Sequence, residues 1–411
     1  MVESKDNLST EKNRRWQRAR DFLEKRGLDV LILTSSHAPT GEPLDRYLSN
    51  WLPGNVVIFP LKGQPTLLVS MIPEIMALRP GTPEGERPWI EDVRVGGRGA
   101  SIVSVFKEKG LERSRVGVVG ISGFATDWEG WIPFRTWDRV MKGLPGCTFE
   151  EVAAPFAESI LVKSSEELTE VRRAAGILEK ACAEMIRTVR SGVTELEVHA
   201  AILNAVAKGG AYSPVLMLRS GPDNVTWGPP AWLFGVGSPR ILAPGDVIQA
   251  EIFGWCGGLE AQVQMSVAIP PVSPPNAECA RLAHEAYQEG LKHLKPGKKF
   301  SEVVAAMDAV LDRPGVWYQT PLIHSMNPMA CIAPSGVRIL SVPGVEAYGE
   351  VGTGRIRGGD VVLEPGMVFE LEANPCMGRH RINIGGTAIV GEKGAEPLNQ
   401  LPSRMRLAGE I

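Results

Sequence analysis

Short apolar runs separated by turn residues characterise the first third of the chain, at residues 29–34, 55–59, 65–69 and 115–120. Each run is long enough for a buried strand and too short for most helices. The segment Lys62-Gly63-Gln64, between the second and third runs, is typical of a hairpin turn. A helix is predicted over residues 14–26, ending at Gly27, after a loose arm at residues 1–12. Strands that alternate with helices predict an α/β domain that ends near residue 157.

The chain after residue 160 begins with two helix starts of the same kind. Ser164 and Glu167 have the spacing of a capping box, in which the hydroxyl caps the helix and the carboxylate bonds back. Thr194 and Glu197 repeat the pattern. Apolar residues after the first box recur at intervals of three and four, which predicts an amphipathic helix. Further helices are predicted at 276–293 and 301–312, and strands at 246–255, 259–269, 361–373 and 380–390.

Polar side chains alternate along the predicted strands. Gln249 and Glu251 share one face of their strand, and the turn at Gly257-Gly258 places Glu251 opposite the segment Gln262–Gln264. Arg381 and Asn383 are expected to share a face of the last strand. The simplest interpretation is a face that meets solvent, as in many antiparallel sheets. A solvent-exposed face is expected to contain a mixture of Lys and Glu. These strands contain amides and single carboxylates instead, which favours a buried site.

Composition and charge narrow the class of protein. The 411 residues are 44% hydrophobic and 22% charged, as in an ordinary soluble globular protein, and predict two or three domains. The net charge of −3 gives no basic field for nucleic acid. No apolar run approaches the length of a membrane span, and the polar N-terminus does not resemble a secretory signal. Six scattered cysteines without a CxxC pair indicate thiols in a reducing cytoplasm.

Three stretches resemble motifs of the creatinase / Xaa-Pro aminopeptidase family, known for its pita-bread fold. Residues 162–168 resemble "K-S-x-x-E-[IL]", and Gly245-Asp246…Glu251 resembles "G-D-x-x-x-x-D". Residues 363–372 resemble the longer motif "L-x-P-G-M-V-F-T-I-E". The resemblance implies an α/β (α+β) fold class. It also implies a creatinase-like N-terminal domain over 1–157 and a pita-bread domain over 158–411, with a curved, mainly antiparallel sheet covered by helices.

The family's metallopeptidases hold two divalent ions with two Asp, one His and two Glu. The resemblance places these ligand positions at Glu251, Gln262, His324, Glu372 and Asn383. Glutamine and asparagine carry no charge and bind divalent ions weakly, so we expect the paired metal site to be lost and no cofactor to be present. A single weak metal at Glu251, His324 and Glu372 is the alternative.

Other family positions are also changed. Two histidines of the metallopeptidases fall on Trp227 and Cys331, and a guanidinium-binding carboxylate of creatinase falls on Gln264. Cys331 lacks the spacing to a histidine that would support a nucleophile. Arg219 and Arg381 can pair with a substrate carboxylate, although structural pairing with Glu is as plausible.

The candidate site follows from these positions. The catalytic candidates are Glu251, His324 and Glu372; the substrate-binding candidates are Gln262, Gln264, Asn383, Trp227, Arg219 and Arg381. Trp227, Trp255 and Trp317 can line an apolar or cation-binding wall, with core packing as the alternative for each. The amides suit neutral hydrogen-bond recognition or mutual satisfaction.

Three functions remain open. The first, which we favour, is a metal-independent hydrolase or lyase of the creatinase type that cleaves a C–N or similar bond of a small polar substrate. Glu251 and Glu372 would bind or polarise the substrate, and His324 would transfer the proton. The second is a non-catalytic binding module, and the third is an Xaa-Pro metallopeptidase with an altered ligand set. The resemblance also implies a homodimer, in which residues near Trp51 approach the partner's cleft.

Overall fold

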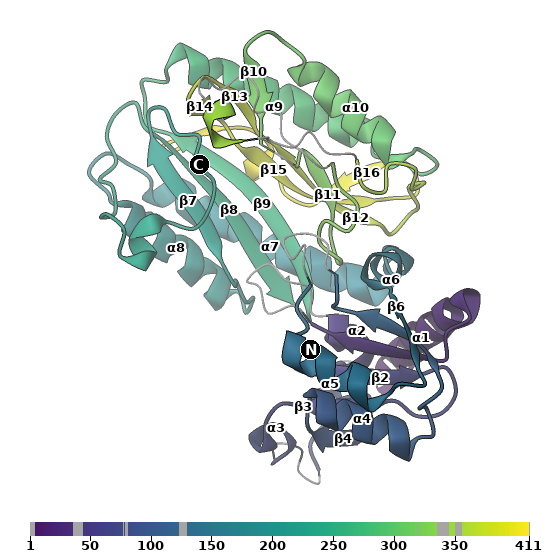
Figure 1. The fold of residues 1–411 in the computed structure, drawn as a ribbon. Helices are drawn as coiled ribbons and strands as arrows, with labels where there is room; N and C mark the ends of the chain where they lie inside the picture. The colour runs from purple at the N-terminus through teal and green to yellow at the C-terminus, as the bar shows by residue number, and fades with distance from the viewer. Residues whose placement is uncertain are drawn as a thin grey trace. The chain divides into compact units, whose positions relative to one another are not determined.

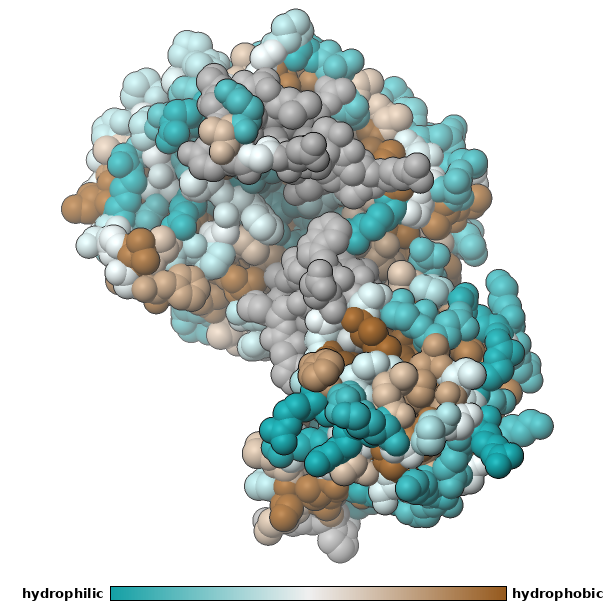
Figure 2. All heavy atoms as spheres, viewed as in Figure 1, coloured by the Kyte–Doolittle hydropathy of each residue, from teal (hydrophilic) through white to brown (hydrophobic). Residues whose placement is uncertain are grey.

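The computed structural model describes residues 5–35, 44–76, 78, 81–122, 130–319, 321–334, 345–349 and 356–410. Contacts divide the chain into two compact units, Met1–Ile160 and Leu161–Ile411 (Figure 1). Hydrophilic side chains dominate the visible surface of both units, with apolar groups among them (Figure 2). None of the helices in the described ranges has the length and apolar character that crossing a membrane requires.

The first unit is built on a mixed six-stranded sheet with the order β4-β3-β2-β1-β5-β6. Its strands are β1 (Val30–Thr34), β2 (Val56–Pro60), β3 (Thr66–Val69), β4 (Asp92–Val95), β5 (Arg115–Val119) and β6 (Thr148–Glu151). The predicted hairpin is confirmed, because β2 and β3 pair antiparallel. The helices are α1 (Lys5–Arg26), α2 (Leu44–Ser49), α3 (Ile72–Met76), α4 (Gly99–Glu108), α5 (Phe134–Gly143) and α6 (Ala153–Ser159), with a short 3₁₀ helix η1 (Glu84–Glu86). Side chains of β1, β2, β5, α4 and α5 form one buried apolar cluster.

Helix α1 begins earlier than the sequence predicts. It starts at Lys5, so the prediction of a loose arm is wrong over residues 5–12. For the last residues of this stretch, a physical reason lies in local ion pairs that the apolar pattern does not register. Glu11 pairs with Arg14 at 2.7 Å and with Arg15 at 2.6 Å, at the spacing of one helical turn.

The second unit is built on a curled sheet of eight strands (Figure 1). Six of them run in the order β11-β12-β15-β9-β8-β7, while β16 pairs with β15 and β17 pairs with β9. Their bounds are β7 (Leu216–Gly221), β8 (Val247–Cys256), β9 (Leu259–Ala268), β11 (Ile323–Ser325), β12 (Val368–Ala373), β15 (Ile384–Val390), β16 (Ala395–Pro397) and β17 (Arg406–Leu407). All pairs except β17–β9 are antiparallel, as the predicted fold class requires. A separate small sheet joins β10 (Val316–Tyr318), β13 (Pro375–Met377) and β14 (His380–Arg381).

Helices cover the sheet of the second unit. They are α7 (Ser165–Thr188), α8 (Glu195–Lys208), α9 (Pro274–His293) and α10 (Phe300–Leu311), with short 3₁₀ helices η2 (Ala231–Phe234), η3 (Val345–Tyr348) and η4 (Leu401–Ser403). Helix α7 contacts β8 and β9, and α9 contacts β12. Apolar side chains of α7, α8, β8 and β9 form a continuous buried core. The other face of these strands is therefore left to carry the polar residues.

Both predicted capping boxes are present. The Ser164 hydroxyl accepts a hydrogen bond from the Glu167 backbone at 3.1 Å, and the Glu167 carboxylate accepts one from the Ser164 backbone at 2.9 Å. Thr194 and Glu197 make the same reciprocal pair at the start of α8. These bonds satisfy amide groups that would otherwise lack partners in the first helical turn.

Two predicted strands have different bounds in the structure. The strand predicted at 361–373 begins only at Val368, because Pro365-Gly366 forms a turn with Gly366 at a φ of +90°. The strand predicted at 380–390 is broken into β14 and β15. Arg381 lies in the small sheet and Asn383 lies between the two strands, so the prediction that they share a face of one strand is wrong.

Candidate functional site

The polar face of the curled sheet is buried. Gln249 and five of the predicted site residues lie on it, each at most 5% exposed: Glu251, Gln262, Gln264, Glu372 and Asn383. The interpretation as a face that meets solvent is therefore wrong. Buried polar groups need hydrogen-bond partners, and most of these residues find them in one another.

Glu251 is held by two N–H donors. It pairs across the β8–β9 hairpin with Gln264, as the sequence predicts. Gln262, next but one along β9, donates from Nε2 to Oε1 of Glu251 at 2.6 Å. The indole Nε1 of Trp227 donates to Oε2 of the same carboxylate. Both oxygens of Glu251 thus accept hydrogen bonds from neutral side chains.

Glu372 has a different pair of neighbours. Gln264 donates from Nε2 to Oε2 of Glu372 at 2.5 Å. Nε2 of His324 lies 3.5 Å from Oε1 of Glu372. Asn383 completes the chain of amides, since its Nδ2 donates to Oε1 of Gln264. Gln264 therefore connects Glu372 to Asn383 and lies opposite Glu251.

Electrostatics at this face favour neutral groups. Burial raises the pKa of Glu251 and raises that of Glu372 well above its usual range, and the negative charge of Glu251 raises the pKa of Glu372 further. Burial lowers the pKa of His324 to about 4, so the imidazole is neutral at physiological pH. Desolvation also lowers the pKa of Arg381, whose charge in turn favours ionised Glu251 and Glu372.

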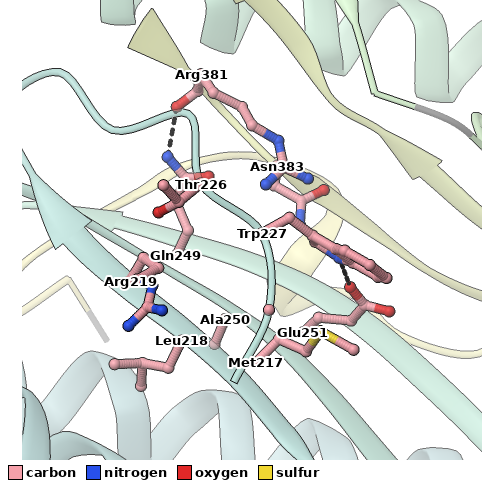
Figure 3. Close-up of a pocket in the computed structure, with 11 residues that line it drawn as sticks. Met217, Leu218, Arg219, Thr226, Trp227, Gln249, Ala250, Glu251, Arg381 and Asn383 are labelled. Carbon is pink, nitrogen blue, oxygen red and sulfur yellow. Dashed lines mark hydrogen bonds between the residues drawn. The ribbon is translucent and has the colours of Figure 1, made fainter. Parts of the chain in front are cut away.

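A narrow, half-open cleft lies beside Glu251, and its empty space of about 210 Å³ includes open solvent (Figure 3). We call it the Glu251 cleft. It is lined by Met217, Leu218, Arg219, Thr226, Trp227, Gly228, Gln249, Ala250, Glu251, Arg381 and Asn383. Figure 3 shows Trp227 beside Glu251 and the guanidinium of Arg381 beside Asn383. Gln249 donates to the backbone carbonyl of Arg381 at 2.6 Å, which ties β8 to β14.

The predicted site residues fall into two groups. Glu251, Trp227, Asn383, Arg219 and Arg381 line the Glu251 cleft. The other four are buried and do not line it: Gln262, Gln264, His324 and Glu372. The structure thus brings the amides and carboxylates together but places only one of the three catalytic candidates at the cleft.

The remaining candidates lie elsewhere. Cys331 is buried, with Sγ 3.3 Å from the hydroxyl of Ser325. Trp317 is packed in the core and donates to the carbonyl of Gly378 at 3.2 Å. Trp51 belongs to the first unit, where Arg46 donates to its carbonyl at 3.1 Å.

Sequence reasoning missed one carboxylate of the site. Glu370 is fully buried on the same face of β12 as Glu372, and Thr387 donates to it at 3.1 Å. Burial raises its pKa well above the usual range, and the charge of Glu372 adds to the effect. The alternation of β12 already pairs Glu370 with Glu372, and this pattern was the available signal.

The residues present do not fit a pair of divalent ions. N–H groups of Gln262 and Gln264 point at the carboxylate oxygens that would serve as ligands. Each of these N–H groups occupies one lone pair of its carboxylate, and the amides bring no negative charge to a cation. In the part of the chain that the structure describes, no three His, Cys, Asp or Glu side chains form a group that would hold a metal ion.

The fold and the site together define an α/β protein with a helix-covered, curled antiparallel sheet and a buried carboxylate–amide face. The chain belongs to metallopeptidase family M24, whose model matches residues 169–395. Peptidases of this family are hydrolases, so the predicted family and enzyme class are confirmed at that level.

Relatives of known sequence are distant. The chain is 22% identical over 257 residues to an Xaa-Pro dipeptidase of Pyrococcus furiosus, which covers 61% of this chain and 67% of the relative. It is 22% identical over 278 residues to a creatinase of a Bacillus species, which covers 64% of this chain and 63% of the relative. The matched part thus spans about two thirds of these relatives or less.

Solved structures share the fold over nearly the whole chain. The X-Pro aminopeptidase from Thermotoga maritima superposes with a TM-score of 0.71 at 17% identity, covering 95% of this chain and 99% of the other. The dipeptidase PepE from Mycobacterium ulcerans gives a TM-score of 0.72 at 19% identity, covering 97% and 98%. These likenesses confirm the predicted fold class.

Proposed function

We propose that this protein is a hydrolase of the creatinase type, which cleaves a C–N or similar bond of a small polar substrate without a bound metal pair. One observation carries the proposal. Gln262 and Gln264 donate N–H groups to Glu251 and Glu372 at positions where the family's metallopeptidases hold ions. The site therefore works through side-chain proton transfer and hydrogen bonding rather than through a bridged pair of cations.

Glu251 is the group that we assign to proton transfer at the substrate. It is the one catalytic candidate that lines the Glu251 cleft, and burial raises its pKa, which favours the protonated form of the carboxyl. Hydrolysis forms a C–O bond to water, breaks the C–N bond and delivers a proton to the leaving nitrogen. Protonated Glu251 supplies that proton, and the carboxylate that remains accepts one from the attacking water.

His324 and Glu372 act behind the cleft. Nδ1 of His324 lies 2.9 Å from the carbonyl oxygen of Ser325, which can only accept, so Nδ1 carries the ring proton. Nε2 then presents its lone pair toward Oε1 of Glu372, a carboxyl whose pKa burial raises well above its usual range. We assign this pair to positioning, because it fixes Gln264 opposite Glu251.

The proposal is tested by the metal content and the activity of the purified protein. Elemental analysis of protein prepared with Mn²⁺ and Zn²⁺ in the growth medium is expected to find no stoichiometric metal. Hydrolysis of a panel of small ureido, guanidino and amide compounds is expected to survive a chelator and to be lost in Glu251→Gln.

A double variant, Gln262→Asp with Asn383→Glu, restores the carboxylates that the family's metallopeptidases have at these two positions. It is expected to gain bound metal, because two anionic ligands replace two amides. Two ions per chain in the wild-type protein would contradict the proposal.

A second candidate is an Xaa-Pro dipeptidase with an altered ligand set. Membership of metallopeptidase family M24 and the Xaa-Pro dipeptidase among the relatives favour it. It requires cleavage of Xaa-Pro dipeptides that depends on added Mn²⁺ or Co²⁺. If the protein is inactive both in the metal-free assay and in the metal-supplemented dipeptide assay, a non-catalytic binding module is the function that remains.

We also propose that the protein is a homodimer. Large apolar side chains are exposed in the segment that follows β7: Leu233, Phe234, Val236 and Ile241. Their exposure supports an interface between two copies of the chain. Light scattering at micromolar concentration tests this, and a monomer would contradict it. Cytoplasmic location stays a prediction.

A further inference from the structure

Arg381 has an unusual environment for an arginine. Its side chain is 4% exposed, and it lines the Glu251 cleft. Its Nε is buried and has no hydrogen-bond partner among the residues that the structure describes. A buried guanidinium costs several kcal/mol, by order of magnitude, unless an anion and hydrogen-bond acceptors face it.

The two carboxylates nearest to Arg381 do not fill this role. The charges of Glu251 and Glu372 act on the guanidinium only at a distance. Their own oxygens accept hydrogen bonds from Trp227 and from the Gln262 and Gln264 amides instead. Neither carboxylate therefore supplies the anionic acceptor that the guanidinium needs.

A second arginine lines the same cleft. Arg219 donates from Nη2 to the carbonyl of Pro229 at 3.0 Å, and no carboxylate pairs with it among the described residues. It lies opposite Gln249 in the β7–β8 register. The Glu251 cleft thus carries two cationic side chains without an anionic partner bonded to either.

Two amide oxygens in the cleft also lack partners. Oε1 of Gln249 and Oδ1 of Asn383 are buried, and neither accepts a hydrogen bond from a described residue. The nitrogen of each amide is already used, by the carbonyl of Arg381 and by Gln264 respectively. Figure 3 shows the Asn383 amide beside the guanidinium of Arg381 and the Gln249 amide beside the Arg381 backbone carbonyl. Neutral oxygens of this kind select an N–H donor.

We propose that the Glu251 cleft binds a small carboxylate that also carries a neutral N–H group, such as a carboxamide or ureido group. The carboxylate pairs with Arg381, with Arg219 adding attraction at the other side of the cleft. The N–H group donates to Gln249 and Asn383. This inference names the substrate class of the site and rests on the proposed function only for calling the ligand a substrate.

The test is a binding measurement with three compounds of matched length. Succinamate has a carboxylate and a carboxamide, succinamide lacks the carboxylate, and succinate lacks the N–H group. We expect calorimetry and thermal shift to detect succinamate, with affinity at least about tenfold above that for either analogue, as expected for one charge-assisted hydrogen bond.

Arg381→Met is the decisive variant. It is expected to lose binding of succinamate and to leave the ligand-free protein as stable as the wild type or more stable, because it removes a buried cation without a bonded partner. Arg379→Met is the matched control, since Arg379 is exposed and pairs with Asp223 at 3.5 Å. It is expected to bind succinamate like the wild type.

Two outcomes would overturn the inference. One is equal binding of succinamate and succinamide, and the other is an Arg381→Met protein that loses stability but keeps its binding. Hydrolysis without metal, together with equal binding of compounds with and without a carboxylate, would contradict this inference and leave the proposed function intact. The opposite result is a stoichiometric metal pair in a protein whose succinamate binding depends on Arg381. It would contradict the proposed function and leave this inference intact.

Discussion

Glu251 and Glu372 occupy similar buried positions but differ in what completes their surroundings. Each accepts an N–H group from a glutamine of β9. The second oxygen of Glu251 accepts from Trp227 at the cleft, whereas that of Glu372 faces His324 in the interior. This difference is the reason why we propose that Glu251 contacts the substrate and that Glu372 is a positioning residue.

The sequence predicts part of this site. Alternation on β8 and β9, with the glycine turn between them, is enough to place Glu251 opposite Gln264. Burial of the face is not encoded in that alternation, because a wet and a dry polar face share the same period of two. The position of Arg381 depends on a break in the strand and on pairing with β13, which are tertiary features.

Gln264 gives the first prediction at the scale of the residue. Gln264→Leu removes a donor to Glu372 and an acceptor from Asn383 while roughly keeping the volume. Because two buried polar groups lose their partners, we expect a loss of about 3 kcal/mol in the free energy of unfolding. Urea denaturation measures it. Gln17→Leu, at an exposed position of α1, is the control and should change little; equal effects would contradict the interpretation.

Asp45 gives a pH-dependent prediction in the first unit. Burial raises its pKa from 3.8 to about 6, although Ser35 and backbone amides donate to it. The folded state therefore binds the proton more tightly than the unfolded state does. The resulting contribution to the free energy of unfolding is fully present below pH 3.8 and is lost as the pH rises to about 6. The shift corresponds to about 3 kcal/mol.

The measurement compares the wild type with Asp45→Asn, which does not titrate at this position. The free energy of unfolding of the wild type, relative to that of Asp45→Asn, is expected to fall as the pH rises from 4 to 7. A difference that stays constant over this range would refute the assignment.

At the scale of elements, the sequence predicts the helix caps more reliably than the bounds of the strands. The capping boxes of α7 and α8 are encoded within four residues and appear as predicted. The bounds of β12 were predicted less well, because Pro365-Gly366 interrupts an apolar run that otherwise reads as one strand. Likewise α1 begins at Lys5, before its predicted start, and an apolar period does not record the ion pairs that Glu11 makes near that start.

The cap of α7 gives a prediction at this scale. Ser164→Ala removes the acceptor for the Glu167 amide and is expected to destabilise the second unit by about 1 kcal/mol. Because α7 packs on β8 and β9, the loss should appear in the unfolding of the whole sheet. Ser165→Ala is the control, since that exposed hydroxyl bonds only to the side chain of Glu166 among the contacts found. Equal losses in a denaturant titration would speak against a specific cap.

At the scale of the whole molecule, each unit contains a hydrophobic core of its own. Phe106 is fully buried in the cluster of the first unit, and Leu178 is fully buried in the cluster of the second. Large-to-small substitutions at such positions cost about 2–5 kcal/mol. Phe106→Ala is therefore expected to reduce amide protection in residues of the first unit, and Leu178→Ala in residues of the second. Hydrogen exchange read by mass spectrometry follows both units in one sample, and a uniform loss across the chain from either substitution would mean that the two cores unfold as one.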